Sequence, residues 1–224
     1  MGFESLIGST HVIFALMKYY LSSYKLGNEL KKLQSLIKQT SGKFGYIPNA
    51  LDFSNSDPEW KKKYIKADMD DLSANGAEIE LLDLKDYFGN EKTLQIKLLS
   101  LGGVYVSGGN TFVLRQAMKV SGFDVIFHEL SKRDDFLYIG YSAGCCLLAK
   151  TLKYYAITDN SKDFPYQQIK ETIWDGLGVL DFIFEPHYDS DHPESASTDK
   201  EINKLIDDKV LFKAYRDGEV LVIE

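Results

Sequence analysis

The sequence predicts an α/β protein with a mainly parallel central sheet and a C-terminal hairpin. Strand-like and helix-like segments alternate along the chain, which is typical of parallel strands joined by crossover helices. The length of 224 residues suits one such domain rather than two. Near the C-terminus, Asp217-Gly218 lies between two strand-like runs and is a strong hairpin signal.

Each element is indicated by its own local pattern. The second helix, for example, begins at Asp57-Pro58, a cap followed by proline, and ends near Gly76. The expected strands are residues 18–22, 43–47, 77–82, 103–107, 136–139, 180–184, 210–215 and 219–223. The expected helices are residues 28–38, 57–75, 93–99 and 199–207, with further helical segments after Asn110 as far as Lys132 and after Ser142.

Composition and continuity favour one globular domain. Hydrophobic residues make up 44% of the chain and charged residues 26%, so a sizeable buried core is expected. No repeat, low-complexity tract or linker interrupts residues 17–224, which we expect to form the domain. Met17 opens a clean strand-like run, so residues 1–16 are expected to be an upstream extension.

Charge and cysteine content argue against several classes of protein. The formal net charge is −7 and the lysines are scattered, which argues against a nucleic-acid partner. No apolar run approaches the ~20 residues that span a bilayer, so no membrane partner is expected. The only cysteines, Cys145 and Cys146, are adjacent in sequence, so we do not expect a set of disulfide bonds. We therefore expect a cytoplasmic protein.

The segment FLYIGYSAGCCLLA carries the most informative chemical signal. It places a G-x-S-x-G pattern between a buried strand and an apolar helix, which is the context of a nucleophile elbow. The sharp turn of such an elbow exposes the serine hydroxyl, and the flanking glycines remove side chains that would collide with it. Ser142 is therefore the candidate nucleophile. The alternative is a glycine-rich turn that binds phosphate or only packs.

A second glycine-rich turn, in VYVSGGNTFVL, follows a strand and precedes a helix. Backbone N–H groups near Gly108 and Gly109 could point at a developing oxyanion. With the N–H of Ala143, one of them would complete a hole of two donors. An ordinary glycine turn is the alternative for this segment.

A serine hydroxyl needs a neighbouring base, and the chain offers four histidines. His11 lies in the expected extension, and His128 lies in a helical segment where packing is the simpler explanation. His187 follows a strand and a proline, at the sheet edge where active sites of open α/β proteins lie. We choose His187 over His192 as the base.

An acid must orient the histidine and stabilise its protonated form. It has to lie near the histidine in space, which distance along the sequence does not reveal. Asp159, in the segment AITDNSKD, is our choice, and Asp163 and Glu185 stay open as alternatives.

Three segments together resemble a known family. SGGNTF, YIGYSAG and EPHY occur in this order, as they do in peptidase E and its relatives, a serine peptidase family that includes cyanophycinase. The resemblance covers residues 17–224. It implies a three-layer α/β/α sandwich related to class I glutamine amidotransferases. It also implies Ser142 as nucleophile, His187 as base and an acid between them in sequence, where Asp159 falls.

The resemblance also implies a substrate. Relatives of peptidase E cleave dipeptides after an N-terminal aspartate without a metal or another cofactor, so a small peptide is the expected partner. Asn110 is expected to contact it. The chain departs from the family at Ser107, where a third glycine often occurs, and in STDKEINKL, which lacks an arginine. Lys200 could replace that arginine as the cation for the aspartyl carboxylate, although a point charge does not copy a bidentate guanidinium.

Three other hypotheses about the function of the protein stay open. His187, Asp189, Asp191 and His192 form a cluster of ligand types suited to zinc or manganese, which would indicate a metal-dependent hydrolase. A catalytically silent domain that binds a small ligand is a second. A cysteine enzyme is the third, although Cys145 and Cys146 have the simpler interpretation of small core residues.

Overall fold

The computed structural model of the protein describes residues 16–224. Apart from Leu16, the expected extension lies outside the described residues, and so does His11. The strands are β1 (Lys18–Ser22), β2 (Lys43–Ile47), β3 (Glu78–Leu81), β4 (Gly103–Val106), β5 (Leu137–Tyr141), β6 (Ile183–Glu185), β7 (Phe212–Ala214) and β8 (Val220–Ile223). The main sheet has six strands in the order β3-β2-β4-β5-β1-β8, all parallel except β8. The predicted α/β class with a mainly parallel sheet is confirmed.

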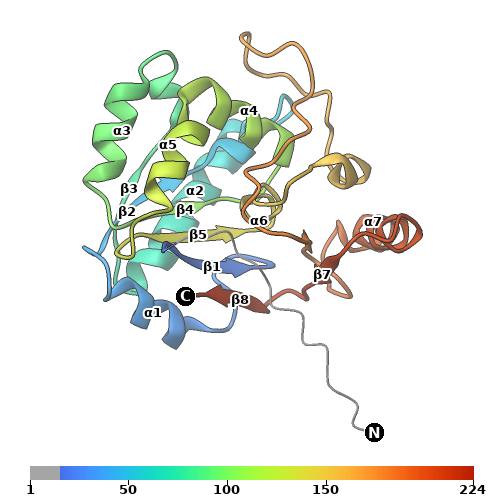
Figure 1. The fold of residues 1–224 in the computed structure, drawn as a ribbon, viewed down its shortest axis with the longest axis horizontal. Helices are drawn as coiled ribbons and strands as arrows, with labels where there is room; N and C mark the ends of the chain where they lie inside the picture. The colour runs from blue at the N-terminus through green and yellow to red at the C-terminus, as the bar shows by residue number, and fades with distance from the viewer. Residues whose placement is uncertain (1–15) are drawn as a thin grey trace, which may run out of the picture.

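Helices cover both faces of this sheet (Figure 1). Successive strand residues point to opposite faces, so Tyr19 and Tyr20 enter different hydrophobic clusters. Leu33 of α1 and Leu72 of α2 pack with Tyr20, whereas Phe112 of α4 packs in the cluster of Tyr19. The helices are α1 (Leu30–Ile37), α2 (Pro58–Ala74), α3 (Glu91–Leu99), α4 (Thr111–Ser121), α5 (Phe123–Leu130), α6 (Ala143–Cys146) and α7 (Ser195–Asp207), with short 3₁₀ turns η1 (Asn49–Leu51), η2 (Leu84–Tyr87) and η3 (Lys153–Ile157). The three-layer sandwich that the resemblance implies is confirmed.

The C-terminal strands differ from the predicted hairpin. The last strand is antiparallel, but its partner is β1 at the edge of the main sheet. β7 instead pairs in parallel with β6 in a separate two-stranded sheet. The Asp217-Gly218 turn therefore carries the chain from one sheet to the other. In Figure 1, β7 and α7 lie at the end of the molecule away from α3. The pairing differs because a free edge beside β1 accepts β8, a distant contact that the local turn pattern does not reveal.

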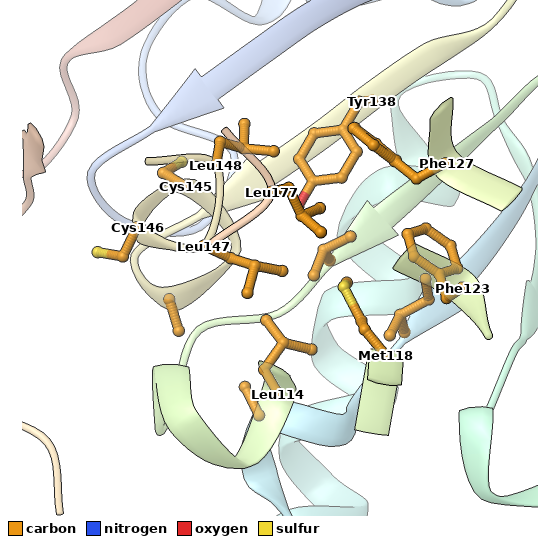
Figure 2. Close-up of a cluster of buried hydrophobic side chains, with 14 of the residues drawn as sticks. Leu114, Met118, Phe123, Phe127, Tyr138, Cys145, Cys146, Leu147, Leu148 and Leu177 are labelled. Atoms are coloured by element: carbon orange, nitrogen blue, oxygen red, sulfur yellow. The ribbon is translucent and has the colours of Figure 1, made fainter. Parts of the chain in front are cut away.

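The helix expected after Ser142 is only one turn long. α6 spans four residues and continues as a series of turns. Cys145, Leu147 and Leu148 of this segment lie in the hydrophobic cluster with Tyr138 and Leu177 (Figure 2). Burial of this segment fixes the chain on the C-terminal side of Ser142. Among residues 16–224, no helix has both the length and the apolar character needed to cross a membrane.

A buried carboxylate fixes the strand that leads to Ser142. Asp68 of α2 is fully buried and accepts hydrogen bonds from the hydroxyls of Tyr46, at 2.5 Å, and Tyr141, at 2.7 Å. Lys25 forms an ion pair with the same carboxylate. Because Tyr141 directly precedes Ser142, this contact ties the candidate nucleophile to the helix layer.

Replacing the buried carboxylate should destabilise the protein. Asp68→Ala is expected to lower the free energy of unfolding by about 3 kcal/mol or more, because it leaves buried donors without an acceptor. Asp70→Ala is the matched control on the same helix, since Asp70 pairs with Lys66 at the surface and should matter by less than about 0.5 kcal/mol. Chemical denaturation measures both changes. Equal midpoints for the two variants would contradict the role of Asp68.

Candidate active site

Ser142 lies at the carboxyl end of β5 in an unusual backbone conformation. Its φ is 46° and its ψ is −116°, a region that non-glycine residues rarely adopt. The turn is tight on both sides. A Cβ atom on Gly144 would lie 2.6 Å from the carbonyl oxygen of Val106, so only glycine fits there. The side chain of Ser142 faces a cavity of about 210 Å³.

Gly108 and Gly109 line the same cavity as Ser142. Gly109 has a φ of 130°, and a Cβ atom there would lie 2.4 Å from the carbonyl oxygen of Ala50. Gly108 lies against Ser142, because a Cβ atom on this glycine would be 3.1 Å from the serine Cβ. Within residues 16–224, the N–H groups of Gly108, Gly109 and Ala143 donate no hydrogen bond to the protein. They are available to a ligand that reaches Ser142.

His187 is held at the end of β6 by backbone and side-chain contacts. Its φ of 61° is again a left-handed value that a non-glycine residue rarely adopts. The N–H of His187 donates to the hydroxyl of Ser23 at 2.8 Å, and Ser23 donates to Asp217 at 2.8 Å. The Nδ1 atom of His187 lies 2.7 Å from Oδ1 of Asp217. A buried serine after β1 therefore links the backbone of His187 to the carboxylate.

The carboxylate of Asp217 fixes the tautomer of His187. An ionised carboxylate only accepts hydrogen bonds, so Nδ1 carries the proton and Nε2 keeps its lone pair. Asp217 follows β7 as His187 follows β6, and parallel strands bring their carboxyl ends together. Asp217 was not predicted as a site residue, because the Asp217-Gly218 pair is typical of a turn. Parallel pairing of β6 and β7 is the signal that would have found it.

Ser142 and His187 line the same cavity. Among the described residues, no hydrogen bond joins the serine hydroxyl to Nε2 of His187. Such contacts often tighten only when substrate is bound. The arrangement brings the predicted nucleophile and the predicted base to one space.

The three acids considered from sequence lie elsewhere. Asp159 accepts a hydrogen bond from the N–H of Thr111 at 2.8 Å and lines a small recess beside Ser142, with no contact to His187 among the described residues. Asp163 binds the backbone and hydroxyl of Ser54. Glu185 is fully buried within β6. Among residues 16–224, the acids that contact His187 are Asp217, 2.7 Å from Nδ1, and Glu194, whose Oε2 lies 3.7 Å from Nε2.

Neither predicted substrate contact lines the cavity of Ser142. The side-chain oxygen of Asn110 caps α4 by accepting from the N–H groups of Phe112 and Val113, and its amide donates to the carbonyl of Asn160 at 3.1 Å. Lys200 is exposed on α7 and does not line the cavity. Lys200 points outward because the buried residues of this helix include Glu201, its neighbour in sequence.

Burial controls the charges at the site. Desolvation, with His192 as a second cause, lowers the pKa of His187 to about 4, although Asp217 acts in the opposite direction. Burial raises the pKa of Glu194 to about 7 and that of Asp159 to about 6. At neutral pH the imidazole of His187 is therefore uncharged and able to accept a proton.

The cysteines near Ser142 are buried core residues. Cys145 donates to the carbonyl of Ser22 and Cys146 to that of Phe184. Burial raises the pKa of both thiols. A thiol that resists ionisation is a poor nucleophile, which argues against a cysteine enzyme.

Comparison with known proteins identifies the family. The sequence profile of peptidase family S51 matches residues 21–224. The chain belongs to peptidase family S51. The predicted resemblance to peptidase E is therefore confirmed.

Curated relatives of this S51 chain share part of its length. The uncharacterized peptidase Lmo0363 of Listeria monocytogenes serovar 1/2a is 32% identical over 128 residues, which are 57% of this chain and 58% of the relative. The uncharacterized peptidase PM1590 of Pasteurella multocida is 31% identical over 143 residues, 64% of this chain and 63% of the relative. The matches thus span less than two thirds of these relatives.

Solved structures share the fold over a longer stretch. A crystal structure of a Listeria monocytogenes EGD-e protein assigned to peptidase E has a TM-score of 0.69 at 23% identity, covering 93% of this chain and 98% of its own. A peptidase from an acI-B1 Actinobacterium has a TM-score of 0.65 at 15% identity, covering 94% and 84%. These neighbours support the α/β fold of the S51 chain.

The predicted metal cluster is not assembled in the S51 chain. Asp189 pairs with Arg216 at the surface, and Asp191 is exposed. His187 and His192 do lie together with Glu194. Their imidazole rings, however, are stacked 3.6 Å apart and within 6° of parallel, so their in-plane lone pairs cannot converge on one ion. Residues in this arrangement do not fit a metal centre.

The proton affinity of His187 tests the His187–Asp217 contact. In NMR titrations, the imidazole is expected to titrate near pH 4, well below the ordinary value of about 6.5. Asp217→Asn should lower this pKa further, because the carboxylate stabilises the protonated ring. Asp159→Asn is the control and should leave it unchanged. A pKa of about 6.5, or no response to Asp217→Asn, would contradict the assignment.

The same shift has a consequence for stability. In the unfolded chain, the imidazole of His187 is protonated below about pH 6.5. In the folded chain it is protonated only below about pH 4. This group therefore lowers the stability of the protein as the pH falls from about 6.5 towards 4.

Proposed function

We propose that the protein is a serine peptidase that hydrolyses short peptides through an acyl-enzyme. The observation that carries the proposal is one cavity lined by Ser142, His187 and Gly109. Behind the lining, Asp217 contacts Nδ1 of His187, and the unpaired N–H of Ala143 directly follows the serine. These are the nucleophile, base, orienting acid and oxyanion donors that acyl transfer needs.

The proposed reaction begins with proton transfer. The Oγ atom of Ser142 attacks the carbonyl carbon of the peptide as Nε2 of His187 takes the hydroxyl proton. The N–H groups of Gly109 and Ala143 stabilise the oxyanion of the tetrahedral intermediate. Breaking of the C–N bond transfers the proton from His187 to the leaving amine and leaves an ester on Ser142. Water then hydrolyses the ester by the same route, and the free serine returns.

We propose Asp217 rather than Asp159 as the orienting acid. The contact between Nδ1 of His187 and Asp217 supports this role. Asp159 lines the recess next to Ser142 and receives the Thr111 N–H. Its position suits contact with the substrate better than contact with the base.

The size of the cavity favours short substrates. A volume of about 210 Å³ is below the range of about 300–1,000 Å³ that is usual for drug-sized ligands. Cleavage after an N-terminal aspartate, which the family resemblance implies, would need a cation beside Ser142. Lys200 does not line the cavity, so that preference stays a prediction from the resemblance without support from the lining.

Replacement of the nucleophile tests the mechanism. Ser142→Ala is expected to lower kcat for dipeptide hydrolysis by roughly 10⁴ or more, because the acyl-enzyme no longer forms. Cys145→Ala is the control for a cysteine nucleophile and should keep most of the activity. Steady-state kinetics on a dipeptide library measures both. Normal turnover by folded Ser142→Ala protein would reject the proposal.

A chelator separates this mechanism from a metal-dependent one. Hydrolysis is expected to be unchanged in excess EDTA, because the stacked imidazoles of His187 and His192 do not form a metal centre. Loss of activity that added zinc or manganese restores would favour the metal-dependent hydrolase instead.

A further inference from the structure

Aromatic side chains form one side of the cavity beside Ser142. We call Tyr24, Phe53, Trp60 and Tyr64 the aromatic wall. Trp60 and Tyr64 are one turn apart on α2, with ring centres 4.9 Å apart, and Phe53 lies 6.3 Å from Trp60. The aromatic wall offers tilted aromatic rings, 34° between Trp60 and Tyr64 and 55° between Phe53 and Trp60, in the same cavity as the nucleophile.

The wall is continuous with the catalytic groups. The ring of Tyr24 packs edge-on against His187 at 6.0 Å and against His192 at 5.5 Å. The rest of the lining includes Leu51, Gly108 and Ser142. A side chain held by the aromatic wall therefore belongs to a residue near the bond under attack.

An acidic side chain would find no compensating charge here. None of the described residues that line the cavity is lysine or arginine, and its one carboxyl group is that of Glu194. The adjoining recess beside Ser142 adds Asp159 and Glu201. A substrate carboxylate in such surroundings loses hydration and gains no cation in return. The cavity therefore disfavours aspartate and glutamate side chains.

A cationic side chain would find two of the four rings of the aromatic wall already in contact with a cation of the protein. The ammonium of Lys25 lies 3.3 Å from the ring centre of Tyr64 and 5.8 Å from that of Tyr24. Lys25 is also paired with buried Asp68, so it cannot neutralise a substrate carboxylate without breaking that pair. A second ammonium would compete with Lys25 for the rings of Tyr64 and Tyr24.

We propose that the cavity binds a neutral aromatic side chain on a residue adjoining the scissile bond. The substrates would then be short peptides with phenylalanine or tyrosine at that position rather than aspartate. Aromatic rings in contact prefer the offset or edge-to-face arrangements that the wall allows. The inference rests on the proposed peptidase function and extends it by naming the substrate class.

Dipeptide kinetics test the preference on the native protein. Phe-Ala and Ala-Phe are compared with Ala-Ala, Asp-Ala and Lys-Ala. One of the two phenylalanine peptides should exceed the other substrates in kcat/KM by roughly 10- to 100-fold, the effect of burying one aromatic side chain. Which of the two is faster assigns the pocket to the acyl or the leaving side of the bond. Equal or faster hydrolysis of Asp-Ala would overturn the proposal.

Variants of the wall locate the preference. Trp60→Ala should lower the ratio of phenylalanine to alanine substrates by about tenfold, and Trp60→Phe should restore most of it. Trp174→Ala is the matched control, because Trp174 is 46% exposed, as Trp60 is 43% exposed, but lies outside the cavity. An unchanged ratio in Trp60→Ala, or the same loss in Trp174→Ala, would overturn the proposal.

Binding to Ser142→Ala protein separates this inference from the peptidase function. Calorimetry should show tighter binding of the preferred phenylalanine dipeptide than of Asp-Ala, by the same 10- to 100-fold. If binding discriminates but the native protein cleaves no peptide, the proposed function fails and the aromatic pocket stands. If peptides are cleaved through Ser142 but neither binding nor kinetics favours the aromatic residue, the inference fails alone.

Discussion

The site depends on the parallel pairing of β6 with β7. The N–H of Tyr215 donates to the carbonyl of Glu185, and the N–H of Tyr188 donates to that of Tyr215. This ladder places the turn that carries His187 beside the turn that carries Asp217, and their side chains meet at 2.7 Å. A slip of one residue would turn side chains to the opposite face and separate the pair. The two-stranded sheet therefore positions His187, the proposed base, against Asp217.

The main sheet supplies the other half of the site. Ser142 follows β5, and Gly108 and Gly109 lie in the turn after β4. Ser23 follows β1 and donates a hydrogen bond to Asp217. Carboxyl ends of neighbouring parallel strands meet at one edge, where active sites of open α/β sheets lie. Burial then keeps His187 uncharged at neutral pH, so that its Nε2 atom has a free lone pair.

Local sequence patterns correctly predicted features that depend on neighbouring residues, such as strand bounds and a helix cap. β1 and β2 have the predicted bounds, and the cap at Asp57 receives the N–H of Trp60 as its sequence indicates. Asp217 escaped prediction because the Asp-Gly pattern is local, whereas the contact with His187 joins residues 30 positions apart through a strand pairing. The surroundings of Asn110 and Lys200 could not be predicted for a similar reason, since the caps and outward faces of helices are decided by packing.

The central claim is that His187, oriented by Asp217, serves Ser142. A crystal structure of the protein inhibited by a peptidyl phosphonate tests it most directly. The account predicts phosphorus bonded to Oγ of Ser142, Nε2 of His187 within about 3 Å of an oxygen of the adduct, and a phosphoryl oxygen at the N–H groups of Gly109 and Ala143. An adduct on another residue, or an imidazole turned away from Ser142 with its contact to Asp217 lost, would contradict it.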